Sequence, residues 1–149
     1  MKRLGLRFPS GARAFFSAAF LLSLISGLLW FSLDRWGEIE GEFGPEKHPW
    51  LASLAKIHGA GAFIALISFG MIFSTHLPVG WRTRQARKSG LSVLACILII
   101  TISAWGLYYA GSDETRALLV WIHLAAGLAL PLTIALHVRG KRRGVVLAR

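Results

Sequence analysis

Four histidines lie inside two long apolar stretches of the chain, and imidazole is both a metal ligand and a proton carrier. One stretch holds His58 and His76, eighteen residues apart, and the other holds His123 and His137, fourteen residues apart. At about 100° per residue, either interval returns an α-helix to within about 40° of its starting direction. Each helix therefore presents two imidazoles on one face, about 27 Å or about 21 Å apart along its axis.

The elements that must position these imidazoles are membrane helices. Only 16% of the 149 residues are charged and 54% are hydrophobic, whereas soluble domains average about 25% charged residues. Four stretches reach the ~20 apolar residues that a membrane helix needs. The predicted spans are residues 14–33, 50–77, 89–110 and 115–138. The predicted fold is an all-α, integral membrane four-helix bundle forming one transmembrane domain.

The basic residues predict how this bundle is oriented. Of the 17 Lys and Arg, four lie before the first span, four between the second and third spans, and five after the fourth. All seven acids lie in the other two connections. Because cytoplasmic loops are enriched in Lys and Arg, both termini are predicted to be cytoplasmic. The net charge of +10 is then a topology signal that also favours anionic lipid, and no nucleic-acid partner is expected.

The two histidine-bearing helices, the second and the fourth, run in the same direction. If the second begins at Pro49, a favoured first helical position, His58 lies nine residues in. If the fourth begins near Asp113, His123 lies ten residues in. These two histidines are therefore predicted at matched depths near the outer surface.

The other two histidines are predicted at matched depths near the cytoplasmic surface. His76 lies two residues before Pro78, where the second span is expected to end, and His137 lies two residues before Arg139. The two histidine intervals differ by four residues, about 6 Å of helix rise. A kink at Pro131 can absorb part of this difference, because proline lacks the N–H that bonds to the preceding turn.

Two imidazoles at one level can ligate a haem iron from both sides of the macrocycle. The spacing therefore predicts one or two haem b groups, bound without covalent attachment because the chain has no CxxCH motif. Glycines beside the histidines, at Gly61 and Gly127, would let the flat macrocycle approach the backbone. Lys56 at the outer level and Arg139 at the inner level would pair with haem propionates. The predicted iron ligands are His58, His76, His123 and His137.

Intramembrane histidines can also form interhelical hydrogen bonds, relay protons or bind zinc. A single such histidine is commonly an interhelical hydrogen-bonding group. A proton relay also uses histidines, but the cores of the four spans contain no acid or lysine as a partner. A zinc site would have only two histidines per level and would lack the remaining ligands. Haem ligation is the interpretation that uses all four side chains.

Two further residues carry chemistry that the spacing does not explain. His48 lies outside the second span, where we expect a loop or helix-cap residue; the alternative is a proton-handling group near a quinone or partner site at the outer surface. Cys96 is the single cysteine, in the apolar segment LACILII. It is expected to be a buried, unreactive thiol.

Four segments resemble the four-helix b-type cytochromes of bacterial membranes, which include the cytochrome b-561 family and the cytochrome b subunits of formate dehydrogenase and nickel–iron hydrogenase. The segments are HPW (48–50), KIHGAGA (56–62), THLPVGW (75–81) and WIHLAAGLALPLTIALH (121–137). The resemblance implies a multi-pass protein of the bacterial cytoplasmic membrane. It also implies electron passage between a quinone pool and another carrier, with a partner redox subunit or a homodimer.

Two functions of different classes follow from these observations. The first is one-electron transfer by a membrane cytochrome, with quinol or quinone oxidoreductase activity where a quinone reaches a haem edge. The second is a cofactor-free membrane subunit that anchors or assembles a larger complex. No nucleophile–base pair, phosphate-binding loop or carboxylate pair indicates a hydrolase or a transferase.

Overall fold

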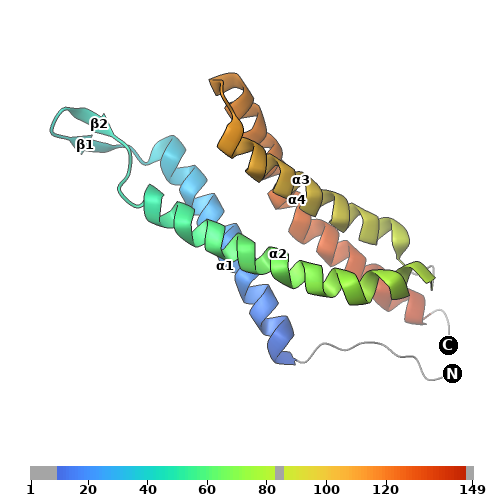
Figure 1. Cartoon of the computed structure of the whole chain (residues 1–149). Helices are drawn as coiled ribbons and strands as arrows, with labels where there is room; N and C mark the ends of the chain where they lie inside the picture. The colour runs from blue at the N-terminus through green and yellow to red at the C-terminus, as the bar shows by residue number, and fades with distance from the viewer. Residues whose placement is uncertain (1–9, 83–85, 147–149) are drawn as a thin grey trace. The chain divides into compact units, whose positions relative to one another are not determined.

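Four long α-helices form nearly all of the structure, a computed structural model that describes residues 10–82 and 86–146 of the chain. The helices are α1 (Ser10–Trp36), α2 (Leu51–Arg82), α3 (Arg87–Tyr109) and α4 (Asp113–Val146) (Figure 1). Each is long and apolar enough to cross a membrane. The prediction of an all-α, four-helix integral membrane fold is confirmed.

Two compact units divide the chain, residues 1–77 and residues 78–149. The first contains α1, most of α2 and the connection between them. The second contains α3 and α4, preceded by the last residues of α2. One transmembrane domain comprising all four helices stays a prediction.

The start of α2 differs from its prediction. The helix begins at Leu51, and Pro49 belongs to the turn before it. His48 organises this turn, since its Nδ1 accepts the N–H of Trp50 (3.2 Å) and its carbonyl accepts the N–H of Leu51 (3.1 Å). His48, three residues before Leu51, therefore closes the turn that precedes the helix. His58 consequently lies seven residues into α2, so the predicted depth of nine residues was wrong.

The end of α2 was also predicted too early. The helix continues through Pro78 to Arg82, five residues beyond the expected end of the span. Proline removes the one hydrogen bond that its N–H would donate to the carbonyl of Ser74. Helices in membranes tolerate this loss because the neighbouring groups re-satisfy the backbone. The fourth helix starts at Asp113 as expected, with the hydroxyl of Ser112 accepting the N–H of Thr115 (3.2 Å).

A small β-hairpin, absent from the sequence-based expectation, connects α1 to α2. Its strands are β1 (Ile39–Gly41) and β2 (Gly44–Glu46), paired antiparallel. Gly44 turns the chain with a φ of 117°, a conformation that side-chain-bearing residues rarely adopt. Lys47 then binds both the carboxylate (2.9 Å) and the carbonyl (2.8 Å) of Asp34. This ion pair ties the hairpin to the end of α1.

In the first unit, α1 and α2 cross at a point made of small residues (Figure 1). A Cβ added to Gly61 would lie 3.1 Å from the backbone nitrogen of Ser23 and 3.3 Å from the carbonyl oxygen of Ala19. Such close backbone approach is typical of small-residue contacts between membrane helices. Gly61 therefore sets the separation of α1 and α2.

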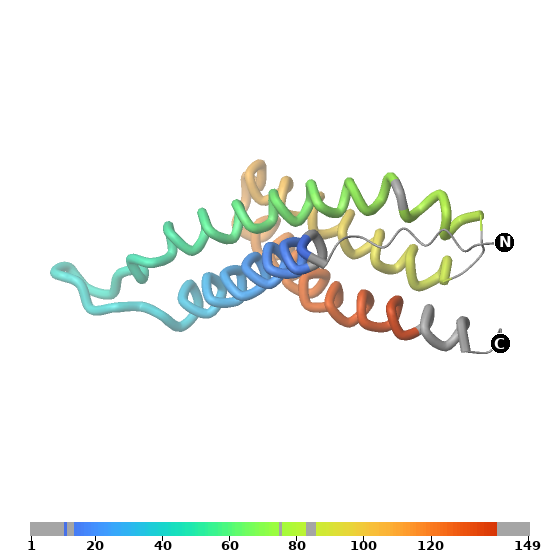
Figure 2. The backbone as a smooth tube through the Cα atoms, turned by 90° about the horizontal axis from the view of Figure 1, so that it is seen from below, coloured from blue at the N-terminus to red at the C-terminus, as the bar shows by residue number. Residues whose placement is uncertain are grey.

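In the second unit, α3 and α4 lie side by side along their length (Figures 1 and 2). The side chains buried between them are small or medium-sized, and Ser103 is the most deeply buried at 2% exposure. Large apolar side chains point outward instead, with Ile102 63% and Leu132 62% exposed. Small residues inside and large apolar residues outside suit a protein whose solvent is hydrocarbon, because lipid gives large apolar side chains no reason to be buried.

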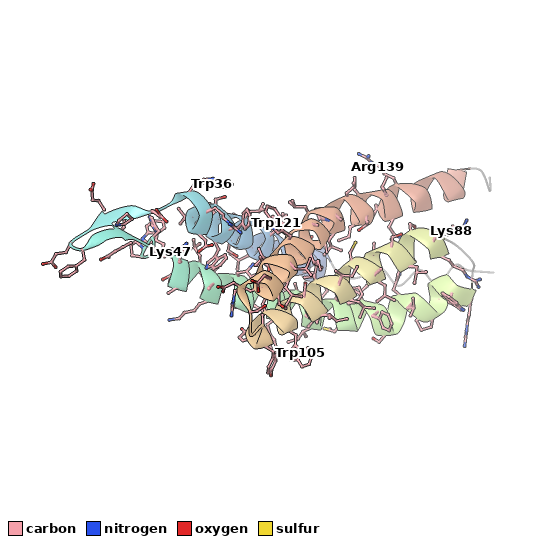
Figure 3. The ribbon with its side chains drawn as sticks, turned by 90° about the horizontal axis from the view of Figure 1, so that it is seen from above. Trp36, Lys47, Lys88, Trp105, Trp121 and Arg139 are labelled. Carbon is pink, nitrogen blue, oxygen red and sulfur yellow. The ribbon has the colours of Figure 1, made fainter. Side chains whose placement is uncertain are left out.

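Two basic residues and a group of exposed aromatic residues lie at opposite ends of the α3–α4 pair. Lys88 at the start of α3 and Arg139 near the end of α4 lie at the same end, and Trp105 lies at the other end (Figure 3). Tyr108 and Tyr109 follow at the aromatic end, 88% and 73% exposed. Basic residues and exposed aromatic residues are both typical of the ends of membrane-spanning helices, where they meet the interfaces.

Adding a methyl group at Gly61 is expected to destabilise the first unit. Gly61→Ala should force α1 and α2 apart at a cost of about 1–3 kcal/mol, typical of overpacking. Gly59→Ala is the matched control, because a Cβ at Gly59 meets no described atom within 4 Å. Thermal unfolding in detergent, followed by circular dichroism, should give a lower Tm for Gly61→Ala than for Gly59→Ala. Equal Tm values would contradict the close crossing.

Candidate functional site

The imidazole of His58 is held by α1. Its Nδ1 lies 2.7 Å from the backbone carbonyl oxygen of Ser23 and 3.4 Å from the hydroxyl of the same residue. A carbonyl oxygen can only accept, so Nδ1 must carry the proton and donate it. In a neutral imidazole the lone pair is then on Nε2. The first unit thus fixes both the tautomer and the direction of this ring.

Gly27 makes this contact sterically accessible. A Cβ added to Gly27 would lie 2.7 Å from both Nδ1 and Cε1 of His58. Gly27 is four residues after Ser23, and helical Cβ atoms tilt toward the N-terminus, so a side chain at this position would cover the Ser23 carbonyl. The missing side chain lets the imidazole reach a carbonyl that is already bonded within α1.

His123 has an equivalent setting in the second unit, where α3 supplies the acceptors. Its Nδ1 lies 3.1 Å from the carbonyl oxygen of Ile100 and 3.1 Å from the hydroxyl oxygen of Ser103. The carbonyl again requires that Nδ1 donates. Nε2 of His123 therefore carries the lone pair, as in His58.

His137, fourteen residues after His123 on α4, is also hydrogen-bonded to α3. Its Nδ1 lies 2.9 Å from the hydroxyl oxygen of Ser89. A Cβ added to the neighbouring Gly90 would lie 3.4 Å from Cε1 of His137, an ordinary contact distance. Both histidines of α4 thus turn Nδ1 toward a serine of α3.

His76 is half-buried on α2, within the helix rather than at its end, since α2 continues through Pro78. His58 and His76 belong to the first unit, and His123 and His137 to the second. The pairing of His58 with His123 and of His76 with His137 stays a prediction.

The other predicted cofactor-binding residues have different surroundings. Gly61 packs against the α1 backbone, which accounts for its lack of a side chain. Gly127 is half-buried, and a Cβ there would meet no described atom within 4 Å. Lys56 and Arg139 are exposed. Contacts of these four residues with a macrocycle or its propionates stay predictions.

The two remaining candidates have plain structural settings. His48 caps α2 through its Nδ1, as the loop or helix-cap interpretation expected, and its ring contacts Trp50 edge-on with centroids 5.9 Å apart. Cys96 was expected to be buried, but it is half-buried. Its sulfur lies 4.0 Å from the hydroxyl of Thr133.

The residues that surround Nδ1 of the imidazoles were not predicted from the sequence: Ser23, Gly27, Ser89 and Ser103. A signal for two of them exists in the sequence. Ser89 and Ser103 are fourteen residues apart, the same interval as His123 and His137. Two helices that pack antiparallel bring such equal intervals into register. The contact of Ser23 with His58 has no such signal, because it uses a backbone carbonyl that every residue possesses.

The chain has no detectable relative among known proteins, and its described residues form no metal-binding cluster. No family model, no curated protein and no solved structure matches this chain. Among residues 10–82 and 86–146, no group of three or more His, Cys, Asp or Glu side chains could hold a metal ion. The resemblance to b-type cytochromes therefore rests on the histidine-bearing segments alone.

Gly27→Ala is expected to displace the imidazole of His58, because the new methyl group would lie 2.7 Å from the ring. Losing the bond to the Ser23 carbonyl should also cost about 0.6 kcal/mol of stability, the average for interhelical bonds in membranes. Gly90→Ala is the control, since its methyl group would lie 3.4 Å from His137. Nitrogen-15 NMR of histidine-labelled protein should show a moved His58 Nδ1 resonance in the first variant and an unchanged His137 resonance in the second. An unmoved His58 resonance would refute the contact.

Proposed function

We propose that this protein is a membrane b-type cytochrome that carries single electrons through one or two haem b groups, each held by two histidines. The observation that carries the proposal is the shared orientation of His58 and His123. Both donate Nδ1–H to a backbone carbonyl of the neighbouring helix, at 2.7 Å and 3.1 Å. Haem-ligating and other metal-ligating histidines use the same arrangement, because it leaves Nε2 as the ligand atom.

The residues of the chain have three tasks in this function. The histidines that would hold the haem iron through Nε2 are His58, His76, His123 and His137. The neighbouring carbonyls and serines fix the ring orientation, and the apolar helices exclude water. Haem, when bound, supplies the one-electron iron couple, whose potential depends on ligand type, hydrogen bonding and burial. Electron transfer needs only ligation, ring orientation and exclusion of water from the protein, and four helices can supply all three.

The proposal includes a setting for the protein in the cell. Both termini lie in the cytoplasm, and the membrane is the bacterial cytoplasmic membrane, as the basic residues and the resemblance indicate. Electrons pass between a quinone pool and a partner redox subunit or a second copy of the chain. The hairpin β1–β2 then lies on the outer side, where its exposed glutamates face water.

A second candidate function is a cofactor-free subunit that anchors or assembles a larger complex. The same hydrogen bonds favour it, since bonds from His58 to α1 and from His123 to α3 join helices in the absence of any cofactor. Interhelical bonds of this kind contribute about 0.6 kcal/mol on average in membranes. The two candidates differ in whether the histidines are needed for more than helix packing.

Haem content separates the two candidates. Protein expressed with ample haem supply should show a b-type reduced-minus-oxidised spectrum, with up to two haems per chain. His58→Ala and His123→Ala should each remove the same haem, because each haem needs both ligands, while His76→Ala and His137→Ala should remove the other. His48→Ala is the control and should keep the full spectrum, because His48 caps α2 outside the span. Wild-type protein without haem would refute the cytochrome and leave the anchor subunit.

The orientation can be tested independently of haem. Alkaline phosphatase is active only outside the cytoplasm, so fusion after Glu46 at the end of the hairpin should give activity. Fusion at the C-terminus should give none, because the last span is expected to return to the cytoplasm. A cytoplasmic reporter, such as green fluorescent protein, should give the reverse pattern. Activity at the C-terminus would contradict the predicted topology.

A further inference from the structure

We propose that Ser89 and Ser103 are positioning residues, which hold His137 and His123 with Nδ1 protonated and Nε2 turned away from α3. The inference rests on the proposed function where it concerns haem. The orientation itself belongs to the α3–α4 pair and is measurable without haem.

The first argument is the register of the two helices. Ser89 lies 2.9 Å from His137, and Ser103 lies 3.1 Å from His123. Fourteen residues separate the two serines along α3, and fourteen separate the two histidines in the opposite direction along α4. Because α3 and α4 are antiparallel neighbours, the two contacts repeat the same geometry about 21 Å apart. A chance contact of one serine would not recur at the other level.

The second argument is the direction of the hydrogen bonds. Ser103 donates its single hydroxyl proton to the Ile99 carbonyl (2.7 Å), and Ser89 donates its proton to the Ala86 carbonyl (3.1 Å). Such back-bonding to the preceding turn is common for serine in helices. Each hydroxyl oxygen is then left with lone pairs facing an imidazole. We assign both serines as acceptors of Nδ1–H, with Ser103 sharing the His123 proton with the Ile100 carbonyl (3.1 Å). This assignment places the lone pair of each histidine on Nε2.

A hydrogen-bond acceptor at Nδ1 strengthens an imidazole as a metal ligand. Partial withdrawal of the Nδ1 proton makes the imidazole a stronger electron donor through Nε2, and the fixed ring loses no freedom on binding. With haem bound, a stronger donor would favour ferric over ferrous iron, so these hydroxyls would lower the reduction potential. Ser89 acts at the inner level and Ser103 at the outer level.

Ser23 differs from the two α3 serines in a way that supplies a control. His58 donates to the backbone carbonyl of Ser23 at 2.7 Å, whereas the hydroxyl is 3.4 Å away. Ser23→Ala removes the hydroxyl and keeps the carbonyl. A second control is Ser92→Ala on α3, because Ser92 is exposed and its hydroxyl bonds to the Lys88 carbonyl.

The test is nitrogen-15 NMR of the full chain in detergent, haem-free and with labelled histidines. Ser103→Ala should shift only the Nδ1 resonance of His123, and Ser89→Ala only that of His137. Ser23→Ala and Ser92→Ala should leave all histidine resonances in place. In haem-loaded protein, the two α3 variants should raise the potential of one haem each and weaken haem affinity about 10-fold or more, and the two controls should not.

The result that would overturn the inference is an Nε2–H tautomer for His123 and His137 in the wild-type protein, or unchanged resonances in both α3 variants. Ser89→Thr and Ser103→Thr keep a hydroxyl and should restore the wild-type resonances and potentials, so a folding defect of the alanine variants is recognisable. Wild-type protein that shows the predicted tautomers but never binds haem would refute the cytochrome and uphold the positioning role. Haem binding with unchanged resonances and potentials in the α3 variants would do the opposite.

Discussion

The constraint on which this structure depends is that hydrocarbon offers no hydrogen-bond partner to a polar group. An imidazole N–H inside the membrane must find its acceptor on a neighbouring helix. Backbone carbonyls and serine hydroxyls are the acceptors that uncharged helices possess, and α1 and α3 supply both kinds. α1 and α3 contain no histidine; α1 holds the ring of His58, and α3 holds the rings of His123 and His137.

This constraint also accounts for the glycines and serines at the helix contacts. An imidazole reaches a carbonyl of another helix only where no Cβ covers that carbonyl, which Gly27 provides beside Ser23. Helices approach closely enough for such bonds only where their contact residues are small, as at Gly61 on α2. Serines that bond back to their own helix, such as Ser103, can be buried without an unsatisfied hydroxyl. Small residues therefore serve packing and hydrogen bonding together.

Hydropathy and charge were sufficient to predict four membrane helices, because a span needs only length and apolar composition. The helix ends were harder to predict. α2 starts after Pro49 because His48 caps it, and it passes Pro78 because one lost backbone bond does not end a membrane helix. The hairpin of β1 and β2 was not expected, because strands of three residues are too short to show the alternation of apolar and polar residues that predicts a strand.

The sequence by itself determined how far apart the histidines of each helix lie along the helix axis and that they share one face. The reason is that the rise and rotation per residue convert a residue interval into a distance and a direction. Only the tertiary structure decided which ring nitrogen of His58 and of His123 carries the proton. Tautomer and ring direction depend on the acceptor opposite Nδ1, and that acceptor comes from a different helix: the Ser23 carbonyl for His58 and the Ile100 carbonyl for His123. Every residue has a backbone carbonyl, so the sequence cannot predict which carbonyl accepts the bond. It becomes visible only once two helices pack.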